Sequence, residues 1–232
     1  MNLQKILNLK FYLNKFFKCY FFLSNIFFRS ITKEKKFLEE QIINFDKINW
    51  NYDKSLKFLN KILYENNLDL YDDSKTSMLS QHLVAFAAIK KFNPKKILEI
   101  GTYDGQTTFI LSKIFPNSEI ISFDLNKSSA LFNNTYHRNN PKIKQNLLIK
   151  RNLNVNQKNI RFIEDNSFNI PKYKLNNFDL IWVDGDHDYP VLSWDICNSY
   201  HLLNSNGIMM CDDIFLKKSD TYKIFKYLIN DR

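Results

Sequence analysis

Short apolar runs that alternate with helix-like segments constrain the fold of this chain more than any other feature of its sequence. Five such runs follow one another: KILEI (96–100), EIISFDL (119–125), IRFIE (160–164), FDLIWVD (178–184) and GIMMCD (207–212). Short apolar strands separated by helices are typical of a parallel sheet that is covered on both faces and joined by right-handed crossovers. We therefore predict an α/β fold with a doubly wound, mostly parallel sheet.

The segments between and before these runs complete the predicted organisation. A helix capped by Thr76 or Ser77 is expected to end at Asn93 and Pro94, and another is expected from Pro190 to Leu203. Before them, residues 33–45 and 52–66 have the pattern of two polar-faced helices. We thus divide the chain into an N-terminal helical extension, residues 1–75, and a main domain, residues 76–232.

Each predicted strand is followed by polar or acidic residues. They are Gly101 to Thr108 after the first strand, Asp124 after the second, Asp165 to Ser167 after the third, Asp184, Asp186 and His187 after the fourth, and Asp212 and Asp213 after the fifth. Because ligands of such sheets bind beyond the carboxyl ends of the strands, these residues predict one binding site along one edge.

The first strand-to-helix turn holds two of the four glycines of the chain, Gly101 and Gly105. Glycines allow a sharp turn and a close approach to a ligand, whose carboxylate can meet N–H groups at the helix start and the hydroxyl of Thr107. Asp124 is placed to accept hydrogen bonds from both hydroxyls of a ribose. A hairpin turn at Asp104-Gly105 is an alternative, and so is a nicotinamide dehydrogenase, although the spacing here is Gly-x-x-x-Gly.

These motifs resemble the class I S-adenosylmethionine-dependent methyltransferases and, among them, the metal-dependent O-methyltransferases of the catechol and sugar types. LEIGTYDGQTT is similar to their first motif, ISFDL to their ribose-binding strand, and IWVDGDHDY and IMMCDDI to their fourth and fifth strands. The resemblance covers residues 76 to 215 and implies a Rossmann-like fold. It implies that S-adenosylmethionine is the cofactor.

The resemblance also implies roles for individual residues. The methionine part of the cofactor would be surrounded by Glu99, Gly101, Thr102, Tyr103, Gly105 and Thr107. Asp124 and Leu125 would hold the ribose, Asp165 and Ser167 the adenine side, and Asp184 would also border the cofactor.

The matching metal ligands would be Asp184, Asp212 and Asp213. Carboxylates crowded on neighbouring strands raise each other's pKa unless a cation is present, and all-oxygen ligation suits Mg²⁺ or Ca²⁺. His187 is the candidate general base, which would take a proton from a small hydroxylated acceptor, sugar-like or catechol-like. The acids can instead cap the following helices, and the histidine can be structural.

The charge of the chain is uneven. Residues 1–36 hold eight Lys and Arg against one Glu, and residues 127–161 hold eight basic residues and no acid. No basic motif interleaved with aromatic residues accompanies them, so nucleic-acid binding is not expected. The apolar, basic pattern of residues 1–36 predicts an amphipathic helix that contacts an anionic membrane surface, covers the core, or pairs two subunits.

Two further expectations concern location and completeness. Three cysteines without metal or disulfide spacing indicate a reducing cytoplasm. The basic segment of residues 1–36 adds the expectation of a peripheral contact at the inner face of the membrane. Nineteen residues follow Asp213, enough for one helix, so the last two strands of the resembled sheet are expected to be lacking. That leaves an alternative function: a cofactor-binding but catalytically incomplete protein that associates with a membrane or a partner.

Overall fold

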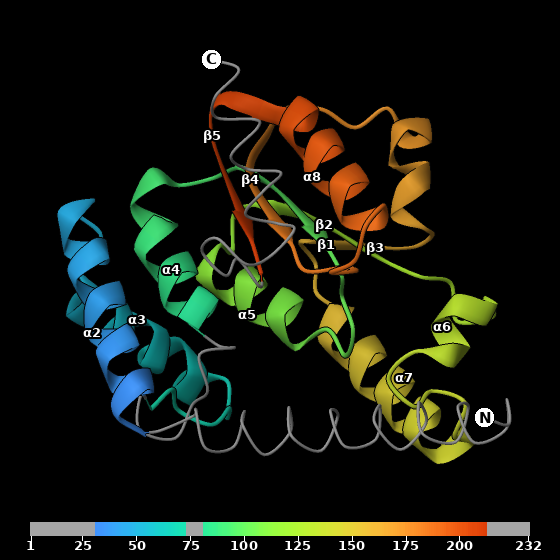
Figure 1. The fold of residues 1–232 in the computed structure, drawn as a ribbon, viewed down its shortest axis with the longest axis horizontal. Coiled ribbons are helices and arrows are strands. Elements are labelled where there is room, and N and C mark those ends of the chain that lie inside the picture. The colour runs from blue at the N-terminus through green and yellow to red at the C-terminus, as the bar shows by residue number, and fades with distance from the viewer. Residues whose placement is uncertain (1–30, 73–80, 213–232) are drawn as a thin grey trace, which may run out of the picture.

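The protein is a layered α/β structure, seen in a computed structural model that describes residues 31–72 and 81–212 (Figure 1). A central sheet has the strand order β3-β2-β1-β4-β5. The strands are β1 (Lys96–Ile100), β2 (Glu119–Asp124), β3 (Ile160–Glu164), β4 (Phe178–Val183) and β5 (Leu203–Cys211). Every adjacent pair is parallel, which confirms the predicted doubly wound sheet.

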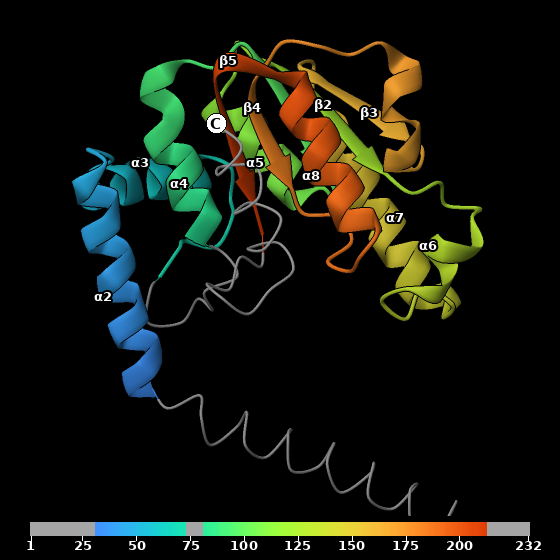
Figure 2. The same cartoon turned by 45° about the horizontal axis from the view of Figure 1, so that its top comes forward.

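Helices cover both faces of the sheet, as predicted. The elements around the strands are α2 (Ile31–Lys47), α3 (Tyr52–Glu65), α4 (Gln81–Ile89), η2 (Lys90–Phe92), α5 (Gln106–Ile114), α6 (Ala130–Asn134), α7 (Pro141–Val155), η3 (Ser167–Tyr173) and α8 (Val191–Leu202). Figures 1 and 2 show α8 across the sheet from α5, with α2 and α3 beside α4.

The alternation of apolar residues along β1 divides the core into two layers. Ile97 packs in a cluster with residues of α3, α4 and α5, whereas Leu98 and Ile100 pack against η3 and α8 on the other face. Successive side chains of a strand point to opposite faces, so a run such as KILEI serves both layers. A strand buried on both faces explains why the predicted strands are nearly continuous apolar runs.

The helix α3 shares the core of the main domain. Leu59 and Leu63 are 0% and 3% exposed and belong to the same cluster as the α4 and α5 side chains. The proposed division near residue 75 falls within residues 73–80, outside the part that the structure describes, and it stays a prediction.

The fifth strand begins earlier than expected. The sequence predicted a helix up to Leu203 and a strand from Gly207, whereas β5 already begins at Leu203, which pairs with Phe178. The register then shifts before Leu180 pairs with Ile208. A Cβ on Gly207 would lie 2.7 Å from Leu203 Cδ1, so the glycine leaves room for that side chain in the irregular segment.

Several predictions concern segments outside the described residues. They are the basic amphipathic segment of residues 1–30, the start of the helix at Thr76 or Ser77, the metal ligand Asp213 and the absence of two last strands after it. Within residues 31–72 and 81–212, no helix has the length and apolar character needed to cross a membrane.

Candidate active site

The carboxyl ends of β1 and β4 meet at a very close backbone contact. Gly101 has φ +100°, and a Cβ built on it would lie 1.9 Å from the Asp184 carbonyl oxygen, so only glycine fits. The Asp184 N–H donates to the Ile100 carbonyl at 2.8 Å, and the Asp212 N–H donates to the Val183 carbonyl at 2.9 Å. The sheet ladder therefore brings the glycine turn and both aspartates to one edge, as predicted.

The glycine turn places the start of α5 at this edge. Gly105 has φ +75° and forms the N-cap of α5, and the Gln106 N–H donates to Asp104 Oδ1 at 3.1 Å. The first amide groups of a helix have no partner within it, so this turn presents donors to an anionic group. Thr107 lies in the same turn and is partly exposed, which suits the predicted contact with a cofactor carboxylate.

Glu99 is a buried residue of β1, two residues before Gly101. Its side chain is 0% exposed, and Oε2 accepts hydrogen bonds from the hydroxyls of Thr108 and Ser122. Burial raises the pKa of Glu99 to about 7, against the lowering effect of the Ser122 and Thr108 hydrogen bonds. Within residues 31–72 and 81–212, Oε1 has no hydrogen-bond partner, so one buried acceptor remains that fits the amino group of the cofactor's methionine part.

Thr102 supports this buried network. Its side chain is 3% exposed, and its hydroxyl lies 2.5 Å from that of Ser122. The hydroxyl is therefore engaged with β2, and the residue can offer a cofactor its backbone alone. Tyr103, next in the chain, is 48% exposed and has φ 51°.

Asp124 is held in place from three sides. Oδ2 accepts from the Tyr103 N–H at 2.9 Å and lies 3.4 Å from Arg151 Nη1, and Oδ1 accepts from the Leu125 N–H at 2.7 Å. A carboxylate accepts about four hydrogen bonds, so roughly one position remains, on Oδ1. Asp124 can thus accept from one ribose hydroxyl in this arrangement, where the sequence predicted two.

Asp165 is engaged within its own turn. Oδ1 accepts from the Asn166 N–H at 2.7 Å and from Asn169 Nδ2 at 2.8 Å, and Oδ2 accepts from the Tyr173 hydroxyl at 2.8 Å. The Asn169 hydrogen bond is the main reason why the pKa of Asp165 is lowered. The residue orders the loop after β3, and Ser167 follows as the first residue of η3.

A candidate ion-binding group lies at the ends of β4 and β5. One ligand atom each from Asp184, His187 and Asp212 lies within 4.8 Å of the others, and all three residues are partly buried. Two carboxylates and an imidazole suit a transition-metal ion such as Mn²⁺ or Zn²⁺. The sequence predicted three carboxylates, an all-oxygen set that suits Mg²⁺ or Ca²⁺. The structure thus adds His187 to the predicted pair, while the third predicted ligand, Asp213, lies outside the described residues.

The connection between β2 and β3 contributes residues that the sequence motifs did not indicate. The Tyr136 and Tyr103 rings pack edge to face at 5.5 Å, and the Arg138 guanidinium lies 5.1 Å and 5.4 Å from their centres. Burial and the nearby Asp184 charge raise the pKa of Tyr136. The segment therefore reaches from the end of β2 toward the end of β4. In the sequence, its basic and acid-free composition was the one feature that set this segment apart.

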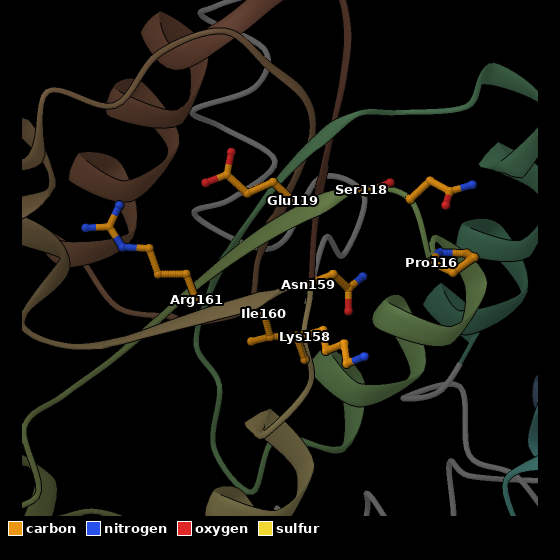
Figure 3. Close-up of a pocket in the computed structure, with 8 residues that line it drawn as sticks. Pro116, Ser118, Glu119, Lys158, Asn159, Ile160 and Arg161 are labelled. Carbon is orange, nitrogen blue, oxygen red and sulfur yellow. The ribbon is translucent and has the colours of Figure 1, made fainter.

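A hollow of the surface lies away from this site. It has a volume of about 430 Å³ and is lined by residues that include Ser118, Glu119, Asn159 and Arg161, at the starts of β2 and β3 (Figure 3). Because parallel strands begin at one edge and end at the other, this hollow is at the edge opposite the glycine turn.

With this geometry established, comparison with known proteins decides the family. A family model described as "Methyltransferase domain" matches residues 98–214, half of the chain. The chain belongs to this family. It is a methyltransferase, as the sequence motifs indicated. The matched region begins in β1 and includes every predicted site residue.

Solved structures of other methyltransferases resemble this methyltransferase at low identity. SAH-bound PaMTH1 of Podospora anserina is 20% identical over 75% of this chain and 79% of its own, with a TM-score of 0.48. The O-methyltransferase TomG of Streptomyces achromogenes, in complex with SAM, is 14% identical over 83% and 85%, with a TM-score of 0.43. Fibrillarin of Aeropyrum pernix, with natively bound S-adenosyl-L-methionine, is 20% identical over 59% and 56%, with a TM-score of 0.40. No curated protein matches the sequence.

Proposed function

We propose that this methyltransferase transfers a methyl group to a hydroxyl oxygen of a small acceptor, sugar-like or catechol-like, with the help of a divalent cation. The observation that carries the proposal is the grouping of Asp184, His187 and Asp212 at the same edge as the glycine turn. A cation held there would lie beside the cofactor. When bound, it would supply Lewis acidity that lowers the pKa of an acceptor hydroxyl.

The glycine turn and Asp124 would bind the two ends of the cofactor. The amide groups at the start of α5 suit the methionine carboxylate, Oε1 of Glu99 suits the amino group, and Oδ1 of Asp124 suits a ribose hydroxyl. Held this way, the cofactor would be bound by residues of β1, β2 and the start of α5. Orientation of two reactants accounts for a large part of such a rate enhancement.

Methyl transfer forms one bond and breaks another. The acceptor oxygen attacks the methyl carbon, the carbon–sulfur bond breaks, and S-adenosylhomocysteine leaves with the electron pair on sulfur. The hydroxyl proton must pass to a base, and His187 is the candidate of the sequence analysis. An imidazole that binds a cation cannot take this proton at the same nitrogen, so the two roles of His187 are separable by experiment.

The test pairs acceptors that differ by one hydroxyl. Catechol and phenol, and a vicinal sugar diol and its deoxy analogue, are incubated with S-adenosylmethionine, and S-adenosylhomocysteine formation is measured with and without EDTA. Two adjacent hydroxyls can bind one cation together, so we expect turnover with the diols, loss of turnover in EDTA and recovery with Mn²⁺ or Mg²⁺. Turnover that EDTA does not affect would remove the cation from the proposal. Equal turnover of phenol and catechol would show that a second, adjacent hydroxyl is not needed.

The alternative of an incomplete, cofactor-binding protein gives a different outcome in the same assay. It predicts S-adenosylmethionine binding by calorimetry together with no turnover of any acceptor.

A pair of variants tests the role of Asp184. Asp184→Asn removes a proposed cation ligand, and Asp188→Asn is its matched control, because Asp188 is exposed in the same loop. We expect the control to keep full turnover and Asp184→Asn to lose most of it.

A further inference from the structure

The helix α7 carries a buried arginine that joins the ends of two strands. The Arg151 side chain is 0% exposed, and its Nη1 lies 3.4 Å from Asp124 Oδ2 while its Nη2 lies 2.5 Å from Glu164 Oε1. Asp124 and Glu164 are direct register partners at the ends of β2 and β3. One guanidinium therefore fixes both carboxylates, and a guanidinium is the group best suited to do so.

Two aromatic rings restrict the orientation of this guanidinium. It lies 4.8 Å from the centre of the Phe162 ring and 5.3 Å from that of Phe132. A planar guanidinium stacks on aromatic faces, so Arg151 has little freedom to leave its two carboxylates.

The same helix also supports the glycine turn. Asn154 lies one turn after Arg151, and its Nδ2 donates to the Asp104 carbonyl oxygen at 2.9 Å. A Cβ on Gly105 would lie 3.0 Å from Asn154 Cβ and 3.1 Å from Val155 Cγ1, so α7 packs directly on the turn. Thus α7 contacts both parts of the proposed cofactor site, the turn after β1 and the carboxylate after β2.

We propose that Arg151 is a positioning residue for S-adenosylmethionine. It does not touch the cofactor but acts through Asp124: Arg151 binds Oδ2, so that Oδ1 faces the ribose. The inference rests on the proposed ribose contact of Asp124. Arg151 takes up Oδ2 together with the Tyr103 N–H, so the remaining acceptor position has one direction. Without Arg151, the carboxylate would lose this constraint and the nearest positive charge.

The positive charge also affects the protonation of Asp124. Burial raises the pKa of Asp124, and Arg151, followed by Arg138, lowers it. Removing Arg151 would raise this pKa further, so the carboxylate would become protonated at a higher pH than in the wild type. Because a protonated carboxyl has lost acceptor capacity, cofactor affinity in the variant should fall more steeply as the pH decreases.

Other charged groups face Asp124 or its partners and must be controlled. They are Glu99 on β1, Arg138 after α6, Glu164 on β3, and Lys127, whose Nζ lies 3.9 Å from Glu164 Oε2. Glu99 titrates near neutral pH, so the experiment is done in the Glu99→Gln background as well as in the wild type. An effect of Arg151 through Asp124 should be present in both.

The test measures the Kd of S-adenosylmethionine by calorimetry for the full chain from pH 5.5 to 8.5. We expect Arg151→Met to weaken binding at least about tenfold at pH 7, with a ratio to wild type that grows as the pH falls. Arg151→Lys should be nearly normal at pH 8 and weaker by roughly threefold to tenfold at pH 6, because an ammonium holds one carboxylate less well than a guanidinium holds two. Arg161→Met, which removes an exposed arginine on β3, should bind within about twofold of wild type.

Each outcome decides a separate point. A wild-type protein that does not bind S-adenosylmethionine would contradict the proposed cofactor site itself. If the wild type binds, a ratio of variant to wild-type Kd that stays constant across the pH range would overturn the role of Arg151 and leave it a purely structural residue. Should Arg151→Met not fold, the same criterion applied to Arg151→Lys decides. In an Asp124→Asn background, Arg151→Lys should change the Kd by less than about twofold, because the carboxylate through which it acts is gone.

Discussion

Gly101 and Asp184 are in backbone contact, and this contact joins the cofactor turn to the proposed cation site. A Cβ on Gly101 would lie 1.9 Å from the Asp184 carbonyl oxygen and 2.4 Å from its carbonyl carbon. The end of β1 therefore cannot change without moving the end of β4, whose side chains form the group with Asp212.

Gly101→Ala is predicted to destabilise the protein strongly. The positive φ of +100° is unfavourable for alanine, and the new methyl group would overlap backbone atoms that cannot rotate away. We expect a loss of about 3 kcal/mol or more in the free energy of unfolding, measured by urea denaturation. The control is Gly185→Ala, where the nearest atom to a Cβ is the Asp195 Oδ2 at 3.2 Å, the end of a side chain. Equal stability losses for the two variants would contradict the backbone contact.

Glu99→Gln is predicted to become relatively more stable as the pH rises. The pKa of Glu99 is raised from 4.5 to about 7, first because of burial, so the folded state retains a proton that the unfolded chain releases. This contribution to stability is complete below pH 4.5 and is lost as the pH rises to 7, a change on the order of 3 kcal/mol. Glutamine cannot ionise and lacks this dependence.

Urea denaturation at pH 5, 6, 7 and 8 measures the difference between Glu99→Gln and wild type. We expect the free energy of unfolding of the variant to increase relative to that of the wild type as the pH rises over this range. Glu119→Gln, at the exposed start of β2, serves as the control and should follow the wild-type curve at a constant offset. Parallel curves for Glu99→Gln would show that Glu99 ionises normally in the folded protein.

His187→Ala is predicted to weaken cation binding. Because its ring nitrogen lies within 4.8 Å of ligand atoms of Asp184 and Asp212, removing it takes away one of three ligands. Calorimetric titration with Mn²⁺ should show a Kd at least about tenfold higher, while the Kd of S-adenosylmethionine changes by less than about twofold. His201→Ala, at the end of α8, is the control. Unchanged Mn²⁺ binding with reduced turnover would instead support the general-base role.

Residues 1–36 are predicted to bind anionic membranes. They hold eight basic residues and one acid. Each basic residue near an anionic surface should contribute about 1 kcal/mol to the free energy of binding. In flotation assays the full chain should rise with vesicles containing a quarter phosphatidylglycerol, and less with pure phosphatidylcholine or in 0.5 M salt. Replacing Lys10, Lys15 and Lys18 by Gln should reduce flotation. Equal flotation on both vesicle types would contradict an electrostatic contact, and none on either would favour core packing or subunit pairing.

The strands and the edge that gathers the site could be predicted because they depend on local patterns. KILEI and IRFIE coincide with β1 and β3, and the carboxyl ends of parallel strands must share an edge whatever the details of packing. The early start of β5 could not be predicted, because it depends on the pairing of Leu203 with Phe178, two residues far apart in the chain.

By itself, then, the sequence determined the order of strands and helices, the position of the two glycines and the acids that end each strand, since hydrophobic period and chain direction are properties of short segments. The tertiary structure alone decided which of these acids keep an available oxygen. Asp124 shares its oxygens with Tyr103, Leu125 and Arg151, and Glu99 is buried with one oxygen that has no hydrogen-bond partner among the described residues. The physical reason is that these hydrogen-bond partners and this burial arise from contacts between distant segments. Arginine is usually a surface residue, yet Arg151 lies fully buried between two strand ends.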